Sequence, residues 1–162
     1  MRKLKLYLDT SVISHLDAPD TPDKMNETLT LWDKIIQGQY DALISDIAIE
    51  EINKCDEPKK SGLYKYLSQI ESLNAIETIE SIDLAEKYIR YGVLKEKSRD
   101  DCRHISLATI MDADYIVSWN FKHFVNVKTI NSVQAVNMLF GYKEVKIISP
   151  SMLLGGDDND EE

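Results

Sequence analysis

The chain has 162 residues, of which 43% are hydrophobic, and its formal net charge is −9. This length and composition predict one domain with a substantial core, and no run of 18 or more apolar residues is present to span a membrane. So acidic a chain excludes a broad basic face for nucleic acid, and such a ligand would need local lysines and bridging metal ions.

The charge is concentrated near the C-terminus. Five of the acids lie in residues 155–162, which leaves a formal charge of −4 for the remainder. We expect a single domain over residues 1–154 and an acidic, disordered tail over 155–162 that improves solubility. The N-terminal Met1-Arg2-Lys3 leads directly into an amphipathic segment instead of the apolar stretch of a signal peptide. A cytoplasmic protein is therefore expected.

The cysteines and histidines show no spacing typical of a disulfide framework or a zinc motif. Both thiols are expected to be reduced. The residues concerned are Cys55, Cys102, His15, His104 and His123.

Short apolar segments alternate with segments of helical periodicity. The short segments predict buried strands at 4–8, 42–44, 115–118 and 145–148. The longer segments predict helices at 27–37, 46–54, 62–72, 81–91 and 100–111. Ser45 and Ser81 are expected to cap two of these helices, because a serine oxygen can accept an amide hydrogen of the first turn. This alternation predicts an α/β fold with a parallel sheet.

Asp9 directly follows the first predicted strand, and the hydroxyl residues Thr10 and Ser11 come next. In open α/β sheets, ligands bind beyond the carboxyl ends of the strands. A carboxylate there can reach a metal or a substrate without being buried among aliphatic side chains. Asp9 is therefore the first candidate of an acidic site.

Two adjacent glutamates follow the second strand. Glu51 shares its helical face with Ile47 and Ala48, whereas Glu50 shares a face with Lys54. Glu51 is the inward-facing candidate, although the pattern alone does not settle the choice. A helix-boundary glutamate that only solvates its end is the alternative.

Asp101 lies at the head of an apolar helical stripe, where an acid is costly unless it is paired, hydrated or bound to a cation. The neighbouring Asp100 is interpreted as a helix cap. His104 is interpreted as a packed, hydrogen-bonded helix residue, because no cysteine or serine is placed by the sequence to act with it as a nucleophile.

Asn120 follows the strand at 115–118, and its side-chain oxygen can ligate a hard cation or orient water, without adding charge. The nearby Trp119, Phe121 and Phe124 are more typical of a core than of a platform for stacked bases. The basic residues available for a nucleic acid are mostly ordinary surface charges when taken singly: Lys54, Lys59, Lys60, Lys95, Lys97, Arg99, Lys122 and Lys128.

Asp9, Glu51, Asp101 and Asn120 all lie near the ends of elements that a parallel sheet can gather at one edge. Mg²⁺ and Mn²⁺ prefer such oxygen ligands, supplemented by water, and can activate water for phosphodiester cleavage. Together these residues predict a site for Mg²⁺ or Mn²⁺.

The chain resembles the PIN-domain family, including the VapC-type toxins of bacterial toxin–antitoxin modules. The similarity covers about residues 4–154 and depends on the order and spacing of several short motifs. These are Leu6-Tyr7-Leu8-Asp9-Thr10-Ser11, Ile44-Ser45-Asp46 through Glu50-Glu51-Ile52, Asp101-Cys102-Arg103-His104 with Ala108, Ile116-Val117-Ser118-Trp119-Asn120-Phe121-Lys122-His123-Phe124, and Lys146-Ile147-Ile148-Ser149-Pro150.

The resemblance implies a three-layer α/β/α sandwich and a metal-dependent ribonuclease. It assigns Asp9, Glu51 and Asp101 as metal ligands, and Thr10 or Ser11 as the supporting hydroxyl. Asn120 stands where many members of the family have aspartate, which removes one negative charge and weakens the expected metal affinity. The resemblance also implies that the chain binds a cognate antitoxin and forms a homodimer. It does not imply association with a membrane.

Two other readings remain open. A PIN-like module that binds RNA or protein with little or no cleavage is favoured by Asn120 and by the acidic balance. An unrelated flavodoxin-like or receiver-type domain would also place an acid beyond a strand, but the chain has no glycine-rich loop that would cradle a phosphate.

Overall fold

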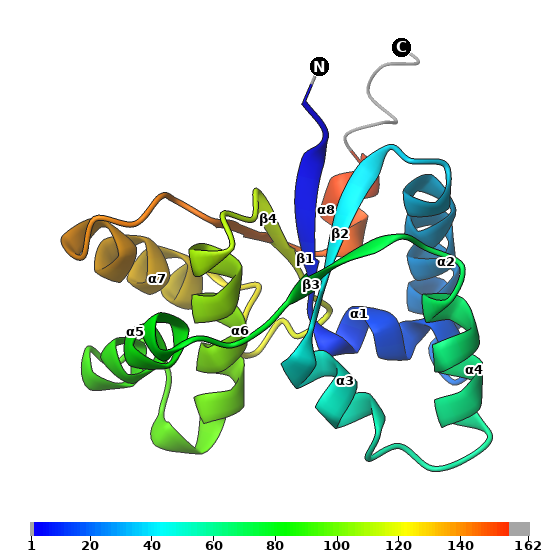
Figure 1. Ribbon diagram of the computed structural model, residues 1–162, viewed down its shortest axis with the longest axis horizontal. Helices are drawn as coiled ribbons and strands as arrows, with labels where there is room; N and C mark the ends of the chain where they lie inside the picture. The colour runs from blue at the N-terminus through cyan, green and yellow to red at the C-terminus, as the bar shows by residue number, and fades with distance from the viewer. Residues whose placement is uncertain (1, 156–162) are drawn as a thin grey trace.

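The computed structural model describes residues 2–155 and centres on a five-stranded sheet (Figure 1). All strand pairs are parallel, and the strand order is β3-β2-β1-β4-β5. The parallel α/β sheet that the sequence predicts is confirmed. The strands are β1 (Leu4–Leu8), β2 (Tyr40–Ser45), β3 (Ser72–Ala75), β4 (Tyr115–Val117) and β5 (Lys146–Ile148).

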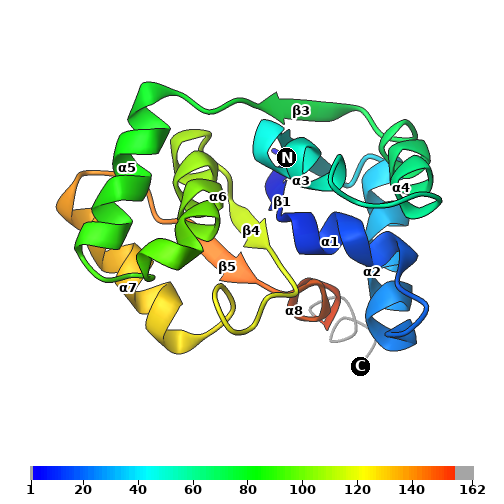
Figure 2. The same cartoon turned by 90° about the horizontal axis from the view of Figure 1, so that it is seen from below.

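Helices cover both faces of the sheet, which gives three layers. Helices α5, α6 and α7 lie on one side, and α1, α2 and α4 lie on the other (Figures 1 and 2). The helices are α1 (Thr10–Ser14), α2 (Pro22–Ile36), α3 (Asp46–Ile52), α4 (Lys59–Leu67), α5 (Ile79–Arg90), α6 (Arg99–Ile110), α7 (Val127–Leu139) and α8 (Pro150–Gly155), with 3-10 turns η1 (His15–Asp17) and η2 (Glu96–Ser98).

The alternation of side chains along the strands builds a separate core on each face. In β1, Tyr7 packs into the core beneath α5, α6 and α7, whereas Leu6 and Leu8 pack into the core beneath α1, α2 and α4. Burial on both faces explains why β1 reads as a nearly continuous apolar run.

The edge strand β3 is absent from the sequence-based prediction, which continues a helix from 62 to 72. That prediction is wrong at its C-terminal end, because α4 ends at Leu67. β3 pairs only with β2, its Leu73 is 46% exposed, and only Ala75 is buried. A polar edge strand with one buried residue has neither the apolar run nor the alternation that identifies a strand. The position of β3 in the sheet is set by its pairing with β2.

The cap of α3 is confirmed, since Ser45 Oγ accepts the Ala48 N–H at 2.9 Å. The predicted cap of α5 is wrong, because Thr78 occupies that position. Thr78 Oγ1 accepts the Ser81 N–H, and Ser81 Oγ accepts the Thr78 N–H, which makes a reciprocal capping box. Asp100 is likewise not a cap, because it lies inside the first turn of α6.

Within residues 2–155, no helix is both long and apolar enough to cross a membrane. Both cysteines carry free thiols, with Cys55 half-buried and Cys102 buried. Gly155, predicted to begin the acidic tail, is the last residue of α8. The rest of that tail, residues 156–162, lies outside the described residues.

Candidate functional site

The strand order places the carboxyl ends of β2, β1 and β4 side by side at one edge of the sheet. The chain passes from β1 to β2 over one face of the sheet, and it passes from β3 to β4 over the other face. Where neighbouring strands are connected over opposite faces in this way, a crevice is expected beyond their carboxyl ends, here those of β1 and β4. Asp9 follows β1, and Ser118 and Asn120 follow β4. The helix that carries Glu51 begins directly after β2.

Asp9 is almost completely buried, at 5% exposure, and its carboxylate is held by two hydroxyls. Ser11 Oγ donates to Asp9 Oδ2 at 2.7 Å, and Ser118 Oγ donates to the same oxygen at 2.8 Å. Ser11 Oγ also accepts the Trp119 N–H at 3.0 Å, which joins the β1 end to the β4 end. These contacts fix the direction of the carboxylate and leave Oδ1 facing His104.

His104 lies between the first two acids of the site. Its Nε2 is 3.0 Å from Glu51 Oε1, 3.8 Å from Asp9 Oδ1 and 3.3 Å from Thr10 Oγ1. The other ring nitrogen, Nδ1, is 2.6 Å from the hydroxyl oxygen of Tyr7. The interpretation of His104 as a packed, hydrogen-bonded residue describes its surroundings, but it misses the position of the ring at the centre of the acidic site.

The charges of this group stabilise one another. Burial opposes a proton on His104, but the hydrogen bond that His104 donates to Glu51 and the charges of Asp9, Glu51 and Asp101 outweigh it and raise the pKa of the imidazole. For Glu51, burial raises the pKa of the carboxyl, while the hydrogen bond and charge of His104 reverse this and lower it. Burial also raises the pKa of Tyr7 well above its usual value, so its phenol is neutral.

The third acid, Asp101, is paired with a different histidine. Asp101 Oδ2 lies 2.7 Å from His123 Nδ1. Partial burial raises the pKa of Asp101, against the opposing effect of His123. Asp101 and His104 are three residues apart on α6, and therefore both face the edge of the sheet.

Asn120 is engaged within its own turn. Its side-chain Oδ1 accepts the His123 N–H at 3.0 Å, and its backbone N–H donates to Ser118 Oγ at 2.9 Å. The residue therefore shapes the loop after β4 and supports Ser118, which in turn holds Asp9. The expected role of its amide oxygen as a ligand competes with this hydrogen bond.

The two glutamates of α3 point in different directions. Glu51 contacts His104, whereas Glu50 is largely exposed, and its Oε2 lies 3.8 Å from Arg103 Nη2. Arg103 is otherwise occupied by Glu77 and Asp100. Glu51, the inward-facing candidate by helical periodicity, is therefore the glutamate that lies at the edge of the sheet.

The oxygen donors of Asp9, Glu51 and Asp101 suit a hard divalent cation in kind. Within the described part of the chain, however, no three carboxylate, imidazole or thiolate groups converge closely enough to enclose a metal ion. Mg²⁺ is commonly held by only one or two protein carboxylates, with water and substrate phosphates completing its shell. The site therefore fits an open, partly hydrated ion better than a closed protein cage.

Sequence reasoning misses Ser118, His123 and Tyr7 as members of the site, and it undervalues His104. Their partners lie far away along the chain: Ser118 contacts Asp9 across 109 residues, and Tyr7 contacts His104 across 97. One signal was available, since Ser118 lies at the end of an apolar segment much as Asp9 does. His104 also shares a helical face with Asp101.

Comparison with models of known protein families finds no match, and comparison with curated proteins finds none either. A match among solved structures is a chain from the crystal structure of VapBC2 from Rickettsia felis bound to a DNA fragment from their promoter. It shares 16% sequence identity, covers 90% of this chain and 98% of the other, and has a TM-score of 0.56. The likeness, with the five-stranded parallel sheet and its two helical layers, shows that this chain has the PIN-type α/β/α fold.

Proposed function

We propose that the protein is a metal-dependent endoribonuclease of the VapC type that hydrolyses RNA phosphodiester bonds. The observation that carries this proposal is the acidic group at the carboxyl edge of the sheet. A buried Asp9 is held by two serines, and Glu51 and Asp101 lie on neighbouring helices that contact the same edge. Burying the Asp9 carboxylate beside two further acids is costly, and a bound cation would lower that cost.

Asp9 and Asp101 are the proposed ligands of Mg²⁺ or Mn²⁺, with Glu51 acting directly or through water. A bound ion of this kind would supply an acidic water and neutralise charge on the attacked phosphate. Ser11 and Ser118 orient the Asp9 carboxylate, and Thr10 lies beside the Glu51–His104 pair. His104 offsets the repulsion between Asp9 and Glu51 and holds Glu51 at the edge. No covalent intermediate is needed, because water is the nucleophile.

The test is cleavage of a panel of structured and single-stranded RNAs with Mg²⁺, Mn²⁺ or EDTA. Two of the proposed ligands, Asp101 and Glu51, have an acidic neighbour that serves as a matched control. Asp101→Asn is compared with Asp100→Asn, and Glu51→Gln is compared with Glu50→Gln, because Asp100 and Glu50 are exposed. We expect metal-dependent fragments that decrease at least about 100-fold in the ligand variants and persist in the controls. Fragments that are independent of metal, or equal in both sets, would contradict the proposal.

Asp9→Asn separates the charge of this residue from its structural role. Asparagine keeps the shape and can still accept from Ser11 and Ser118, so the fold should persist while cleavage decreases at least about 100-fold. Circular dichroism checks the fold, and the same RNA panel measures the activity. Unchanged cleavage would remove Asp9 from the mechanism.

Partners are proposed on the same basis. The matched structure is of VapBC2 with promoter DNA. By analogy, this chain is proposed to bind a cognate antitoxin and to form a homodimer. Copurification with the product of an adjacent gene tests the first, and sedimentation equilibrium of the purified chain tests the second. A monomer at all concentrations would exclude the homodimer.

A second candidate is a PIN-like module that binds RNA or a protein without cleaving it. It is favoured by the engagement of the Asn120 amide in its own turn and by the separation of the acids. RNA retention without fragments under any metal condition, together with no metal uptake by calorimetry, would select this candidate.

A further inference from the structure

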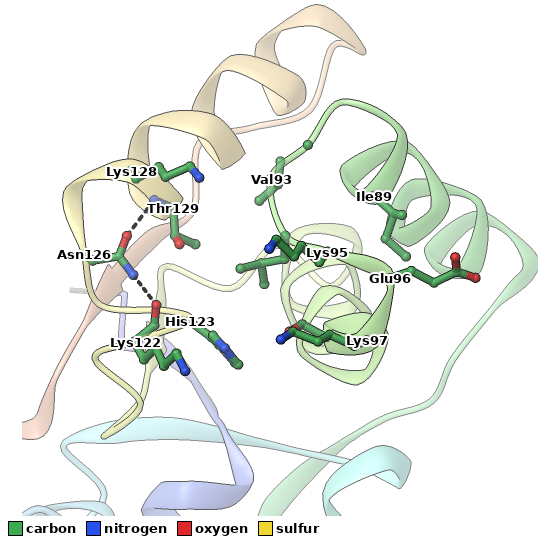
Figure 3. A pocket seen from close by; sticks show the side chains of 13 residues that line it. Ile89, Val93, Lys95, Glu96, Lys97, Lys122, His123, Asn126, Lys128 and Thr129 are labelled. Atoms are coloured by element: carbon green, nitrogen blue, oxygen red, sulfur yellow. Dashed lines mark hydrogen bonds between the residues drawn. The ribbon is translucent and has the colours of Figure 1, made fainter.

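A cleft of about 630 Å³ lies between the end of α5, the α5–α6 connection and the start of α7 (Figure 3). Its volume is within the range of about 300–1,000 Å³ found for ligand sites. Four lysines line it: Lys95 and Lys97 on one wall, and Lys122 and Lys128 on the other. Figure 3 shows their side chains extending toward the space between the walls.

The positive charge of this cleft is not neutralised by its surroundings. Over residues 2–155, none of the four lysines forms an ion pair. The one acid of the lining, Glu96, instead lies 3.3 Å from Arg99. Four like charges around one cavity repel one another, and they do so in a chain with a net charge of −9. An anionic ligand would relieve this repulsion.

One wall of the cleft is fixed by Asn126. Its Oδ1 accepts the Thr129 N–H at 2.8 Å and caps α7, while its Nδ2 donates to the Lys122 carbonyl at 2.9 Å. The 13-residue helix α7 therefore begins at the cleft, where its N-terminal amides add a partial positive charge. Asn126 therefore fixes the position of Lys122 in the loop relative to Lys128 in α7.

The cleft is also adjacent to the acidic site. His123 lines the cleft, and its Nδ1 contacts Asp101 Oδ2 at 2.7 Å. A chain of phosphates bound by the lysines would therefore continue past a single imidazole to the acids at the edge of the sheet.

We propose that this lysine cleft binds the backbone phosphates of a single RNA strand next to the cleavage site. The inference rests on the proposed nuclease function and adds how the substrate is held. Lysine is depleted at protein–protein interfaces, whereas phosphate neutralisation is its usual role with nucleic acids. No phenylalanine, tyrosine or tryptophan is among the described residues that line the cleft, and contacts to phosphates do not read base edges, so the binding is expected to be independent of base sequence.

The test is equilibrium binding of a short fluorescent oligouridine in EDTA, so that no metal-dependent cleavage is required. Lys97→Gln/Lys122→Gln removes one charge from each wall. Lys54→Gln/Lys65→Gln removes the same charge from exposed positions near α3 and α4, and is the control. Each phosphate contact contributes about 0.7 to the salt slope of single-strand binding. The cleft variant should therefore lose about 1.4 from the slope and bind about 25-fold more weakly at ~0.1 M salt.

An unchanged slope and affinity in the cleft variant, or an equal loss in the control, would overturn the proposal. Lys95→Gln/Lys128→Gln is a second, independent pair if the first variant does not fold.

Failure of the wild-type protein to bind the oligouridine also overturns the proposal. Binding of polyglutamate that is lost in the cleft variant alone would assign the cleft to an acidic protein instead. If wild type binds through the cleft but does not cleave RNA with Mg²⁺ or Mn²⁺, the nuclease proposal fails and the cleft assignment stands.

Discussion

Two carboxylates share one buried imidazole at the carboxyl end of β1. His104 is 1% exposed, and its Nε2 faces both Glu51 and Asp9. Without a positive charge between them, these acids would repel one another in a poorly solvated space. The raised pKa of His104 and the lowered pKa of Glu51 express the same interaction from its two sides. The pair therefore contributes stability that depends on pH.

We predict that Glu51→Gln and His104→Gln couple in a double-mutant cycle by about 0.5–3 kcal/mol in the free energy of unfolding. The His104 contribution is complete below the unfolded pKa of about 6.5, and is lost as pH rises through the raised folded pKa. The Glu51 contribution is present above its unfolded pKa of about 4.5, and is lost as pH falls through the lowered folded pKa. Coupling is therefore expected to be largest between about pH 4.5 and 6.5.

Urea denaturation across this pH range measures the cycle. A parallel cycle with Glu50→Gln is the control, because Glu50 does not contact His104 and should show almost no coupling. A Glu51–His104 coupling that persists unchanged in alkaline solution would mean that packing, and not charge, joins the two side chains.

At the scale of secondary structure, α3 determines where Glu51 lies. The helix has seven residues, and its start is fixed by Ser45 at the buried end of β2. Because a helix of this length has little stability of its own, the position of α3 depends on its cap and on packing against the sheet. Ser45, which caps α3 at its junction with β2, therefore helps to position the proposed ligand Glu51.

Ser45→Ala is predicted to lower the free energy of unfolding by about 1 kcal/mol, because the Ala48 N–H would lose its acceptor in a buried position. RNA cleavage should also decrease if α3 shifts. Ser132→Ala, at a half-buried position inside α7 and away from any helix cap, is the control and should change stability by less than about 0.5 kcal/mol. Equal effects of the two substitutions in urea denaturation would show that the cap does not anchor α3.

At the scale of the whole molecule, two cores share a single sheet. Leu84 of α5 packs in the core of one face, and both tryptophans of the chain, Trp32 and Trp119, pack in the core of the other. Strands β1, β2, β4 and β5 contribute alternate side chains to the two cores, so neither core can form without the sheet. The two faces are expected to unfold together, as a single domain would.

Leu84→Ala is predicted to cost about 2.7–5 kcal/mol, because it removes buried methyl groups and leaves a cavity. Tryptophan fluorescence reports only the opposite core, yet its urea midpoint should fall together with the midpoint from circular dichroism. Ile82→Ala, on the same helix at a position that is 50% exposed, should cost less than about 1 kcal/mol. A fluorescence transition that Leu84→Ala leaves unchanged would indicate two independently folding units.

Local patterns in the sequence predict the strands and helices that have strong patterns of their own. The apolar run of β1 and the periodicity of α6 agree with the structure, because burial on both faces of a strand and on one face of a helix leaves a direct pattern. β3 and α7 were not predicted. β3 is an edge strand with one buried residue, and α7 buries residues without a marked apolar stripe.

The sequence by itself determined which acids are candidates, since Asp9, Glu51 and Asp101 stand at element boundaries where a buried carboxylate requires a reason. It also determined the parallel α/β class. Only the tertiary structure decided that His104 joins Asp9 to Glu51, that Ser118 holds Asp9, and that lysines from two separate segments line one cleft. The physical reason is that helical faces and strand ends are set by local geometry, whereas hydrogen bonds and charge clusters join residues that only the packed sheet brings together.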